Sequence, residues 1–367
     1  MKEDVFGLLG PLTRTLSARG VTQTVILRDD PALRYLLERL DPSIRVVKLA
    51  DSRNPFKFWR QQLQALVEET RMPVDACHLH GFVPGALGAW AHRRGALPSH
   101  IYLSPHGSRL FRVFKPLGRV LLRALGLLLK GAVVVQLVAS FEEGRRVTDL
   151  TTGQTKLIER PVDEVFFRTL RSETERSSVV SGSDVLDDMA ADRFSQLAVL
   201  YWPETDPADF HWWGPTSAQA QALLMAAGVT MHSSPDARAR AEALASAWMF
   251  VVLGTDHAVQ FLLAEAMASG LAAIAWSPSG VSDYTSHGEN GLIAASEGET
   301  LDAISQLADS HALRTALGMK ARADATLRFS HRSFEANLLA AYHFIDAASA
   351  PCVASPVTVK ERSREER

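Results

Sequence analysis

The chain has little of what would mark it as secreted, metal-binding, membrane-spanning or bound to nucleic acid. Its 367 residues include 2 cysteines, Cys77 and Cys352, too few and too far apart for a disulfide framework or a zinc site. The net charge of −2 provides no global basic field to attract nucleic acid. No stretch reaches roughly 18 uncharged apolar residues, and the opening MKEDVFGLLG lacks the apolar segment of a signal peptide. These absences predict a protein of the cytoplasm with no metal site.

What is present is the composition of a globular protein with more than one core. Hydrophobic residues make up 47% of the chain and charged residues 22%. A chain of this length exceeds one ordinary core, so two domains are expected. Strand and helix patterns alternate along the first half, which predicts a parallel sheet: helices at 4–19, 31–40 and 55–70, and strands at 21–27, 44–49 and 75–79.

The most informative stretch runs from Met249 to Ala294. Its pattern predicts a buried strand at 249–253, a helix at 260–269 and a second buried strand at 271–276. The loops that follow the two strands carry the polar residues, including His257 and the run from Ser277 to Asp283. Because ligands bind at the carboxyl ends of parallel strands, we expect a binding crevice here.

Three motifs in this stretch resemble the donor-binding core of the family 4 glycosyltransferases, which are retaining enzymes of the GT-B fold. They are LAEAMASG at 263–270, Gly280-Val281, and HGENGLI at 287–293, in the family's order and spacing. The resemblance implies an α/β protein with two Rossmann-like, doubly wound domains that face each other across a cleft. It implies an acceptor domain at 1–160, a donor domain at 161–328, and a helix at about 329–348 that crosses back onto the first domain. The polar tail at 350–367 is expected to be disordered.

The resemblance also implies a donor site for a nucleotide sugar linked to UDP or GDP, without cofactor or metal. Glu265 would accept hydrogen bonds from the ribose hydroxyls, and His257, where the family normally has Glu, would contact the donor sugar. The remaining donor-binding residues implied are Gly182 and the loop residues Gly280, Val281, Ser282 and Asp283.

The chain departs from the family where the donor diphosphate is normally bound. Relatives follow the first strand of the second domain with Gly-Arg and then Lys, whereas here Gly182 is followed by Ser183 and by Asp184, Asp187 and Asp188. Aspartates near a diphosphate would repel it, and Arg160 at the hinge is the candidate replacement charge. The family's first strand and Gly-rich loop are also missing ahead of the first helix. These departures favour an alternative, a catalytically inactive glycosyltransferase-like binding or partner subunit.

Two histidines close predicted strands in the first domain. His80 follows the strand at 75–79, and His106 and Gly107 follow a strand that begins at Ile101. In relatives these positions line the acceptor pocket, so His80 is a candidate catalytic residue, and His106 and Gly107 are candidate acceptor contacts. A histidine at a strand end can hydrogen-bond a sugar hydroxyl; the structural interpretation is that it satisfies loop backbone. His78, deeper in the sheet, is interpreted as structural.

Residues 109–130 form a stretch of basic and apolar residues with no acids. It is either a core helix with a solvated basic edge or a surface that contacts an anionic membrane. Because many relatives act on lipid-linked acceptors, the second interpretation predicts a peripheral location on the inner face of the plasma membrane. The sequence thus predicts retaining sugar transfer to a glycan or lipid-linked acceptor, in bacterial polysaccharide or lipopolysaccharide biosynthesis.

Overall fold

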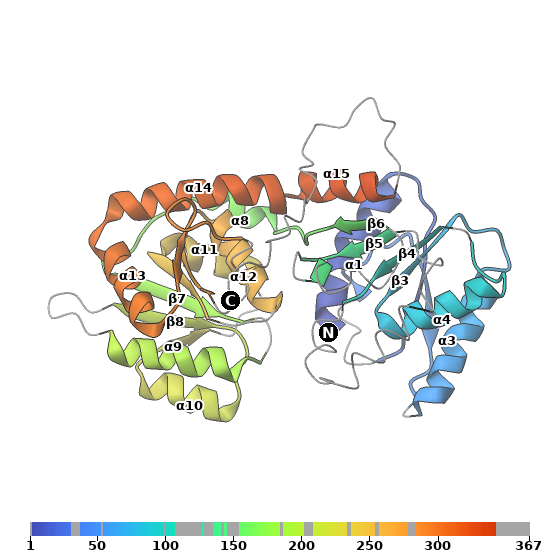
Figure 1. The fold of residues 1–367 in the computed structure, drawn as a ribbon, viewed down its shortest axis with the longest axis horizontal. Helices are drawn as coiled ribbons and strands as arrows, with labels where there is room; N and C mark the ends of the chain where they lie inside the picture. Colours follow the sequence, from blue (N-terminus) through green and yellow to red (C-terminus); the bar gives the residue numbers. More distant parts are fainter. Residues whose placement is uncertain are drawn as a thin grey trace, which may run out of the picture.

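The computed structural model describes residues 2–30, 37–52, 54–98, 100–106, 127, 135–140, 143–144, 154–183, 186–201, 208–232, 236–253, 257–277 and 284–342, with backbone alone at 2–6 and 257–260. These residues form two α/β bodies that lie side by side, and the helices at the C-terminal end run across both (Figure 1).

The first body alternates strands and helices, as predicted, and all its strand pairs are parallel. Its elements are α1 (Lys2–Ala18), β1 (Thr24–Arg28), β2 (Arg45–Leu49), α3 (Pro55–Glu69), β3 (Ala76–His80), α4 (Phe82–Arg93), β4 (His100–Ser104), β5 (Val135–Val138) and β6 (Gln154–Leu157). Its strands form two separate sheets in the orders β1-β2 and β3-β4-β5-β6. The helices expected at 4–19 and 55–70 and the strands expected at 44–49 and 75–79 are confirmed within one or two residues.

Helices bridge the seam between these two sheets. Leu9 of α1 packs against Leu27 and Val46 of the small sheet, while Leu12 of the same helix packs against Tyr102 of the large one. On the face of the large sheet that carries the Ile101 side chain, α4 packs against β3. The neighbouring helix α3 packs against β1 and β2 of the small sheet. Strands β1 and β3 are only half-buried, whereas β4 and β5 are almost wholly buried. Helix α1 on one face and helices α3 and α4 on the other therefore extend across the gap beside β3 that separates the two sheets.

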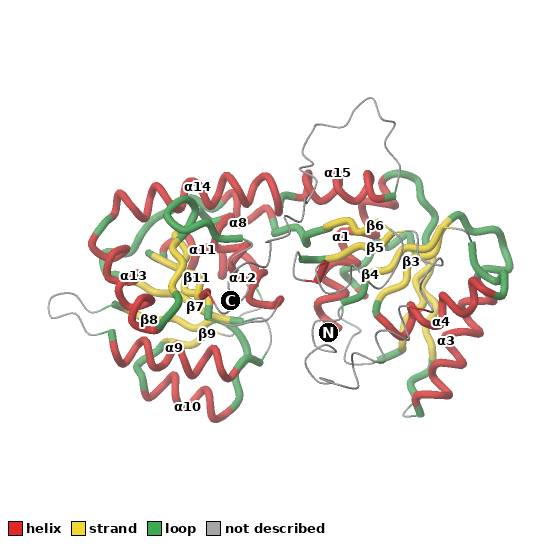
Figure 2. Tube along the Cα trace, viewed as in Figure 1, coloured by secondary structure: helices red, strands yellow, loops and turns green. Residues whose placement is uncertain are grey.

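The second body is a parallel sheet with helices on both faces (Figure 2). Its elements are α8 (Glu164–Arg168), β7 (Ser178–Gly182), α9 (Asp188–Leu200), β8 (Asp209–Trp213), α10 (Ala218–Ala226), β9 (Thr230–His232), α11 (Ala237–Ser246), β10 (Met249–Val252), α12 (His257–Ala268), β11 (Ala272–Trp276), β12 (Leu292–Ala294), α13 (Glu297–Asp309) and α14 (His311–Phe329). The strand order is β12-β11-β10-β7-β8-β9. The chain runs outward from β7 in one direction and from β10 in the other, so the switch point of this doubly wound sheet lies between these strands.

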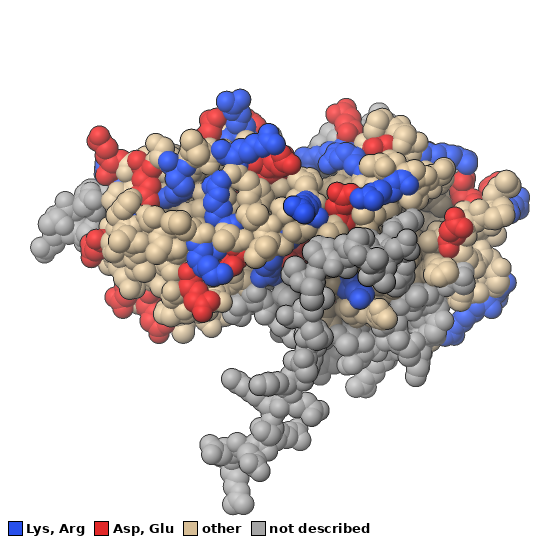
Figure 3. All heavy atoms as spheres, turned by 90° about the horizontal axis from the view of Figure 1, so that it is seen from above, with Lys and Arg blue, Asp and Glu red and all other residues tan. Residues whose placement is uncertain are grey.

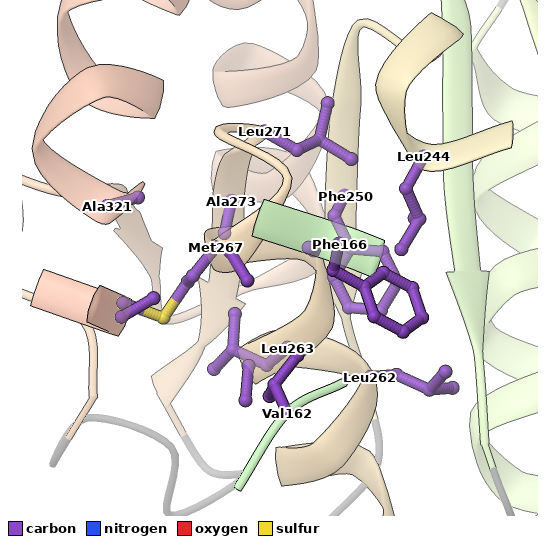
Figure 4. Packing of buried hydrophobic residues seen from close by; sticks show 14 of the residues in the cluster. Val162, Phe166, Leu244, Phe250, Leu262, Leu263, Met267, Leu271, Ala273 and Ala321 are labelled. Carbon is purple, nitrogen blue, oxygen red and sulfur yellow. The ribbon is translucent and has the colours of Figure 1, made fainter. Parts of the chain in front are cut away.

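Both faces of this sheet are packed with apolar side chains. Neighbouring residues of a strand point to opposite faces, and accordingly Trp212 and Trp213 of β8 are 0% and 6% exposed in two different clusters. Figure 4 shows the cluster in which Phe166 of α8 and Met267 of α12 pack with Phe250 of β10. Because α12 is apolar on nearly every side, it is held between the sheet, α8 and α14.

A glycine lets α14 approach the end of α12. A Cβ atom at Gly318 would lie 2.1 Å from the carbonyl oxygen of Gly270, which is a backbone atom that cannot turn aside. Gly270 itself has a φ of +73°, the left-handed conformation in which helices commonly end. This contact fixes the position of α12 relative to α14.

The last described helix, α15 (His331–Ala341), returns to the first body. Its Phe334 and Leu338 pack with Leu12 of α1 and Leu137 of β5. Over α14 and α15, basic and acidic side chains are interspersed and pair with each other, as in Lys320–Asp324 and Arg19–Glu335 (Figure 3). In the part of the chain that the structure describes, no helix is long and apolar enough to cross a bilayer.

Candidate functional site

A cluster of histidines lies where β3 and β4 end. His80 Nδ1 lies 3.0 Å from His106 Nε2, and the two rings are stacked with centroids 5.2 Å apart. Since β3 and β4 are parallel and adjacent, their carboxyl ends bring together two residues that are 26 positions apart. The structure thus joins the two histidines that the sequence assigned to the acceptor side, while Gly107 lies outside the described residues.

Burial keeps the imidazoles of His78 and His80 neutral. Desolvation, followed by the neighbouring His106, lowers the pKa of His78 to about 3. Desolvation also lowers the pKa of His80 well below its ordinary value, with further contributions from His78 and His106. A neutral imidazole carries one N–H donor and one acceptor nitrogen, so the His80–His106 contact can use one of each. The histidine pair can orient a hydroxyl group by hydrogen bonding, and the buried ring of His80 adds no positive charge at neutral pH.

His78 anchors the return of the chain rather than facing a ligand. Its Nε2 lies 2.9 Å from Ser104 Oγ, and its Nδ1 lies 2.6 Å from the hydroxyl oxygen of Tyr342, the residue that follows α15. Tyr342 stacks on Tyr102 with ring centroids 4.3 Å apart. These contacts support the structural interpretation of His78 and tie the end of α15 to the base of the histidine pair.

The residue His106 adopts a backbone conformation that is uncommon for its type. Its φ of +46° makes it the one non-glycine residue with positive φ among the described residues. Such a conformation costs free energy and tends to occur at functional sites. Here His106 lies two residues after the end of β4 and presents its imidazole ring to His80.

In the second body, the corresponding edge is formed by the ends of β7, β10 and β11. Gly182 is the last residue of β7, and a Cβ atom there would lie 2.1 Å from the carbonyl oxygen of Trp213. The close approach of β8 therefore explains this glycine by packing alone. Ser181 Oγ donates to the carbonyl oxygen of Val251, which links β7 to β10 at the switch point (2.7 Å).

A cation that the sequence analysis missed lies at this edge. Arg193 of α9 places its guanidinium 3.6 Å from the ring centroid of Trp276, the last residue of β11. Its Nη1 also donates to the carbonyl oxygen of Leu253, immediately after β10 (3.5 Å). The guanidinium of Arg193 therefore places its positive charge at the carboxyl ends of β10 and β11, where the fold predicts a ligand.

Two of the three aspartates near β7 bind backbone instead of facing a ligand. The carboxylate of Asp187 accepts the amide of Ala190 and caps α9, and Asp188 accepts the amide of Ser217 (3.3 Å). Asp184 lies outside the described residues. The two described carboxylates therefore serve local structure, as acids at the start of a helix often do.

Arg160 lies between the two bodies. Its guanidinium is 4.2 Å from the ring centroid of Phe261 on α12. On the other side it fills the space beside Gly7 of α1, where a Cβ atom would lie 2.8 Å from its Cζ and Nη1. The residue that the sequence singled out as a replacement charge is thus held against the donor helix.

Glu265 is paired more tightly than the resemblance suggests. Its two carboxylate oxygens accept hydrogen bonds from Nε and Nη2 of Arg240 on α11, each at 2.6 Å, and both side chains are largely buried. A carboxylate offers about four acceptor positions, and Arg240 occupies one on each oxygen. Contact between Glu265 and a ribose remains a prediction.

One expectation from the sequence is wrong. His257 was placed in the loop after β10, but its backbone is the first residue of α12. The helix starts three residues earlier than expected because no Gly or Pro follows Gly254-Thr255-Asp256 until Gly270. The other predicted donor residues, Gly280, Val281, Ser282 and Asp283, and nearly all of 109–130 lie outside the described residues.

The described residues contain no group of three or more His, Cys, Asp or Glu that could hold a metal ion. The two edges offer the His80–His106 pair, an ion-paired carboxylate and arginines. Such groups bind hydroxyls and anions.

Comparison with known proteins identifies the fold. Residues 188–310, which span α9 to the end of α13, match the model of the family described as "Glycosyl transferases group 1". No curated protein matches the sequence.

Solved structures match nearly the whole chain. Sucrose-phosphate synthase from Thermosynechococcus elongatus is 18% identical with a TM-score of 0.71, covering 92% of each chain. HepE from Anabaena, in complex with UDP, is 14% identical with a TM-score of 0.71, covering 94% of this chain and 96% of that one. The lipopolysaccharide outer core galactosyltransferase WaaB is 13% identical with a TM-score of 0.69, covering 92% and 95%. The chain therefore has the GT-B glycosyltransferase fold, and the fold predicted from its motifs is confirmed.

Proposed function

We propose that this protein transfers a sugar from a UDP- or GDP-linked donor to a glycan or lipid-linked acceptor, with retention of anomeric configuration. The observation that carries the proposal is the glycosyltransferase group 1 match over α9–α13, on a sheet whose switch point lies between β7 and β10. The likeness to HepE, which has been solved with UDP and with UDP-glucose, supports a nucleotide-sugar donor. The likeness to WaaB supports a role in polysaccharide or lipopolysaccharide biosynthesis.

On the donor side, the main electrostatic task is to stabilise negative charge on the departing nucleoside diphosphate. Arg193 on Trp276 and Arg160 on Phe261 are the cations that we assign to it. Glu265, oriented by Arg240, would accept the ribose hydroxyls. Gly182 and the loop at 280–283 would contribute backbone amides, and His257 would contact the donor sugar.

On the acceptor side, we assign His80 and His106 to the hydroxyl that attacks the donor sugar. Because burial lowers the pKa of His80, its ring is neutral at pH 7 and can accept or donate one hydrogen bond without adding charge. The basic stretch 109–130 would supply peripheral contact with an anionic membrane if the acceptor is lipid-linked.

A second candidate function rests on a specific observation. Where the resemblance implies Arg and then Lys after Gly182, the chain has Ser183 and, at the start of α9, Asp188. This favours a glycosyltransferase-like subunit that binds its ligand without turnover.

Calorimetric titration with UDP and with GDP tests the proposal. We expect one of them to bind, since both candidate functions keep the nucleotide pocket; no heat with either at millimolar concentration would overturn the transferase. Release of nucleoside diphosphate from UDP- or GDP-hexoses in the presence of saccharide acceptors then separates the two functions. Binding without any release would favour the inactive subunit.

A further inference from the structure

A cavity of about 370 Å³ lies in the first body, away from the donor edge. It is bounded by the end of β1, the residues after β2, and the first turns of α3 and α4. The residues that line it include Arg28, Ser52, Phe58, Trp59, Gln62 and Pro84. Because β1, β2 and β3 all end here, the cavity lies at the edge of a parallel sheet where ligands bind. Its volume is at the small end of the range for ligand pockets, roughly 300–1,000 Å³.

The wall from α3 is aromatic and open to solvent. Trp59 is 36% exposed, and Phe56 packs edge-on against it with ring centroids 5.3 Å apart. None of the residues of α3 is fully buried, so the apolar surface of this helix is not used up by the core. The face of an indole ring carries partial negative charge and attracts C–H groups that carry partial positive charge. The apolar face of a pyranose ring presents such C–H groups.

The rest of the cavity is polar but close to neutral. The guanidinium of Arg28 lies over the Phe58 ring at 5.2 Å, and it forms an ion pair with Asp51. The Oε1 atom of Gln62 is buried and has no hydrogen-bond partner among the described residues. Ser52 adds a hydroxyl group at the mouth. Donors and acceptors of this kind suit hydroxyl groups, which both donate and accept, and the Asp51 carboxylate disfavours an anionic ligand.

The cavity shares an element with the strand end that carries His80. Val83 and Pro84 line it from the first turn of α4, and α4 follows His80 after a single residue, Gly81. A ring held on Trp59 would therefore lie on the same edge of the first body as His80 and His106.

We propose that this cavity binds one pyranose ring of a neutral saccharide, with its apolar face on Trp59 and its hydroxyls on Arg28 and Gln62. That the saccharide is the acceptor of sugar transfer rests on the proposed function; that a saccharide binds here does not. A nucleobase could also stack on the indole, and the test must distinguish the two.

Saturation-transfer NMR tests the proposal, with methyl α-glucoside, methyl β-galactoside and methyl α-mannoside as probes and uridine as the rival ligand. We expect transfer to the ring protons of at least one glycoside, and a fall of about tenfold in Trp59→Ala. The matched control is Trp90→Ala: Trp90 is 38% exposed on α4, stacks with Arg94 and does not line the cavity. Trp59→Phe, which keeps a ring, should retain part of the signal and covers the case in which the alanine variant does not fold.

No transfer to any glycoside, an equal loss in the two alanine variants, or transfer to uridine alone would each overturn the proposal. Calorimetry with UDP and GDP on the same samples keeps this result separate from the proposed function. Nucleotide binding without glycoside binding would contradict the saccharide pocket and leave the proposed transferase function standing. Glycoside binding without nucleotide binding would contradict the transferase function and leave the saccharide pocket standing.

Discussion

At the scale of single residues, the Glu265–Arg240 pair predicts a large effect on stability. Replacing Glu265 by Ala leaves the buried Arg240 guanidinium without its two hydrogen-bond acceptors, which costs about 3–5 kcal/mol of unfolding free energy. Urea denaturation measures this loss. The double variant Glu265→Leu/Arg240→Met removes both charges and should recover most of it. Equal stability of Glu265→Ala and the unchanged protein would contradict the buried pair.

The buried histidines predict a stability that falls with acidification. The pKa of His78 is lowered to about 3 in the folded protein, against about 6.5 when unfolded. Between these values the unfolded chain binds the extra proton, so unfolding free energy rises with pH, by up to about 1.4 kcal/mol per pH unit for one histidine. In urea titrations below pH 6, His78→Gln should have a shallower slope than the unchanged protein. Above pH 7.5 the two slopes should agree, and identical slopes throughout would refute the buried neutral His78.

Some residues of the candidate site could be predicted from residue patterns, and others could not. His80 and His106 were found because each closes a strand, and parallel neighbouring strands must bring their ends together. Arg193 was missed because it lies inside an ordinary amphipathic helix, and nothing in its local sequence shows that it reaches Trp276, 83 positions away. The partner of Glu265 was missed for the same reason, since Arg240 belongs to a different helix.

At the scale of elements, the contact between α14 and the end of α12 predicts an asymmetry between two glycines. Gly318→Ala places a methyl group against the backbone of Gly270 and should destabilise the protein by about 1–3 kcal/mol. Gly298→Ala on α13 is the matched control, because a Cβ atom there meets nothing within 4 Å, and it should stabilise by up to about 1 kcal/mol. Thermal unfolding of the two variants measures the contrast, and similar midpoints would disprove the close approach.

The seam in the first body predicts uneven protection of its strands. Neither β1 nor β3 has a strand partner across the seam among the described residues, and both are half-buried. Unpaired strand edges leave amides open to solvent. Hydrogen exchange followed by mass spectrometry should therefore show faster exchange in peptides covering 24–28 and 76–80 than in those covering β4 and β5. Equal protection of all four strands would contradict the seam.

Most elements were predictable because their apolar periodicity agrees with the fold. The strands at 249–253 and 271–276 and the helix at 55–70 stand within two residues of their predicted bounds. The start of α12 was misplaced, since polar residues such as His257 can continue a helix as readily as a loop when no Gly or Pro follows.

At the scale of the whole molecule, the two bodies present the carboxyl ends of their parallel strands with different chemistry. The edge of the second body carries Arg193. Beside it lies α12, whose Phe261 contacts Arg160 and whose Glu265 pairs with Arg240. The edge of the first body carries the His80–His106 pair, in which His80 is neutral, and an aromatic cavity whose arginine is ion-paired with Asp51. This division suits an anionic donor on one side and an uncharged hydroxyl acceptor on the other, which is the arrangement that sugar transfer from a nucleotide sugar requires.

The central claim is that Arg193 takes over the diphosphate contact at the switch point. The most direct measurement compares calorimetric affinities for UDP and uridine, and for GDP and guanosine, in the unchanged protein, in Arg193→Gln and in Arg238→Gln, a control at an exposed pair with Glu242 on α11. The account predicts that one diphosphate binds at least about tenfold more tightly than its nucleoside. That ratio should collapse in Arg193→Gln alone. A ratio near one in the unchanged protein, or one untouched by Arg193→Gln, would contradict it.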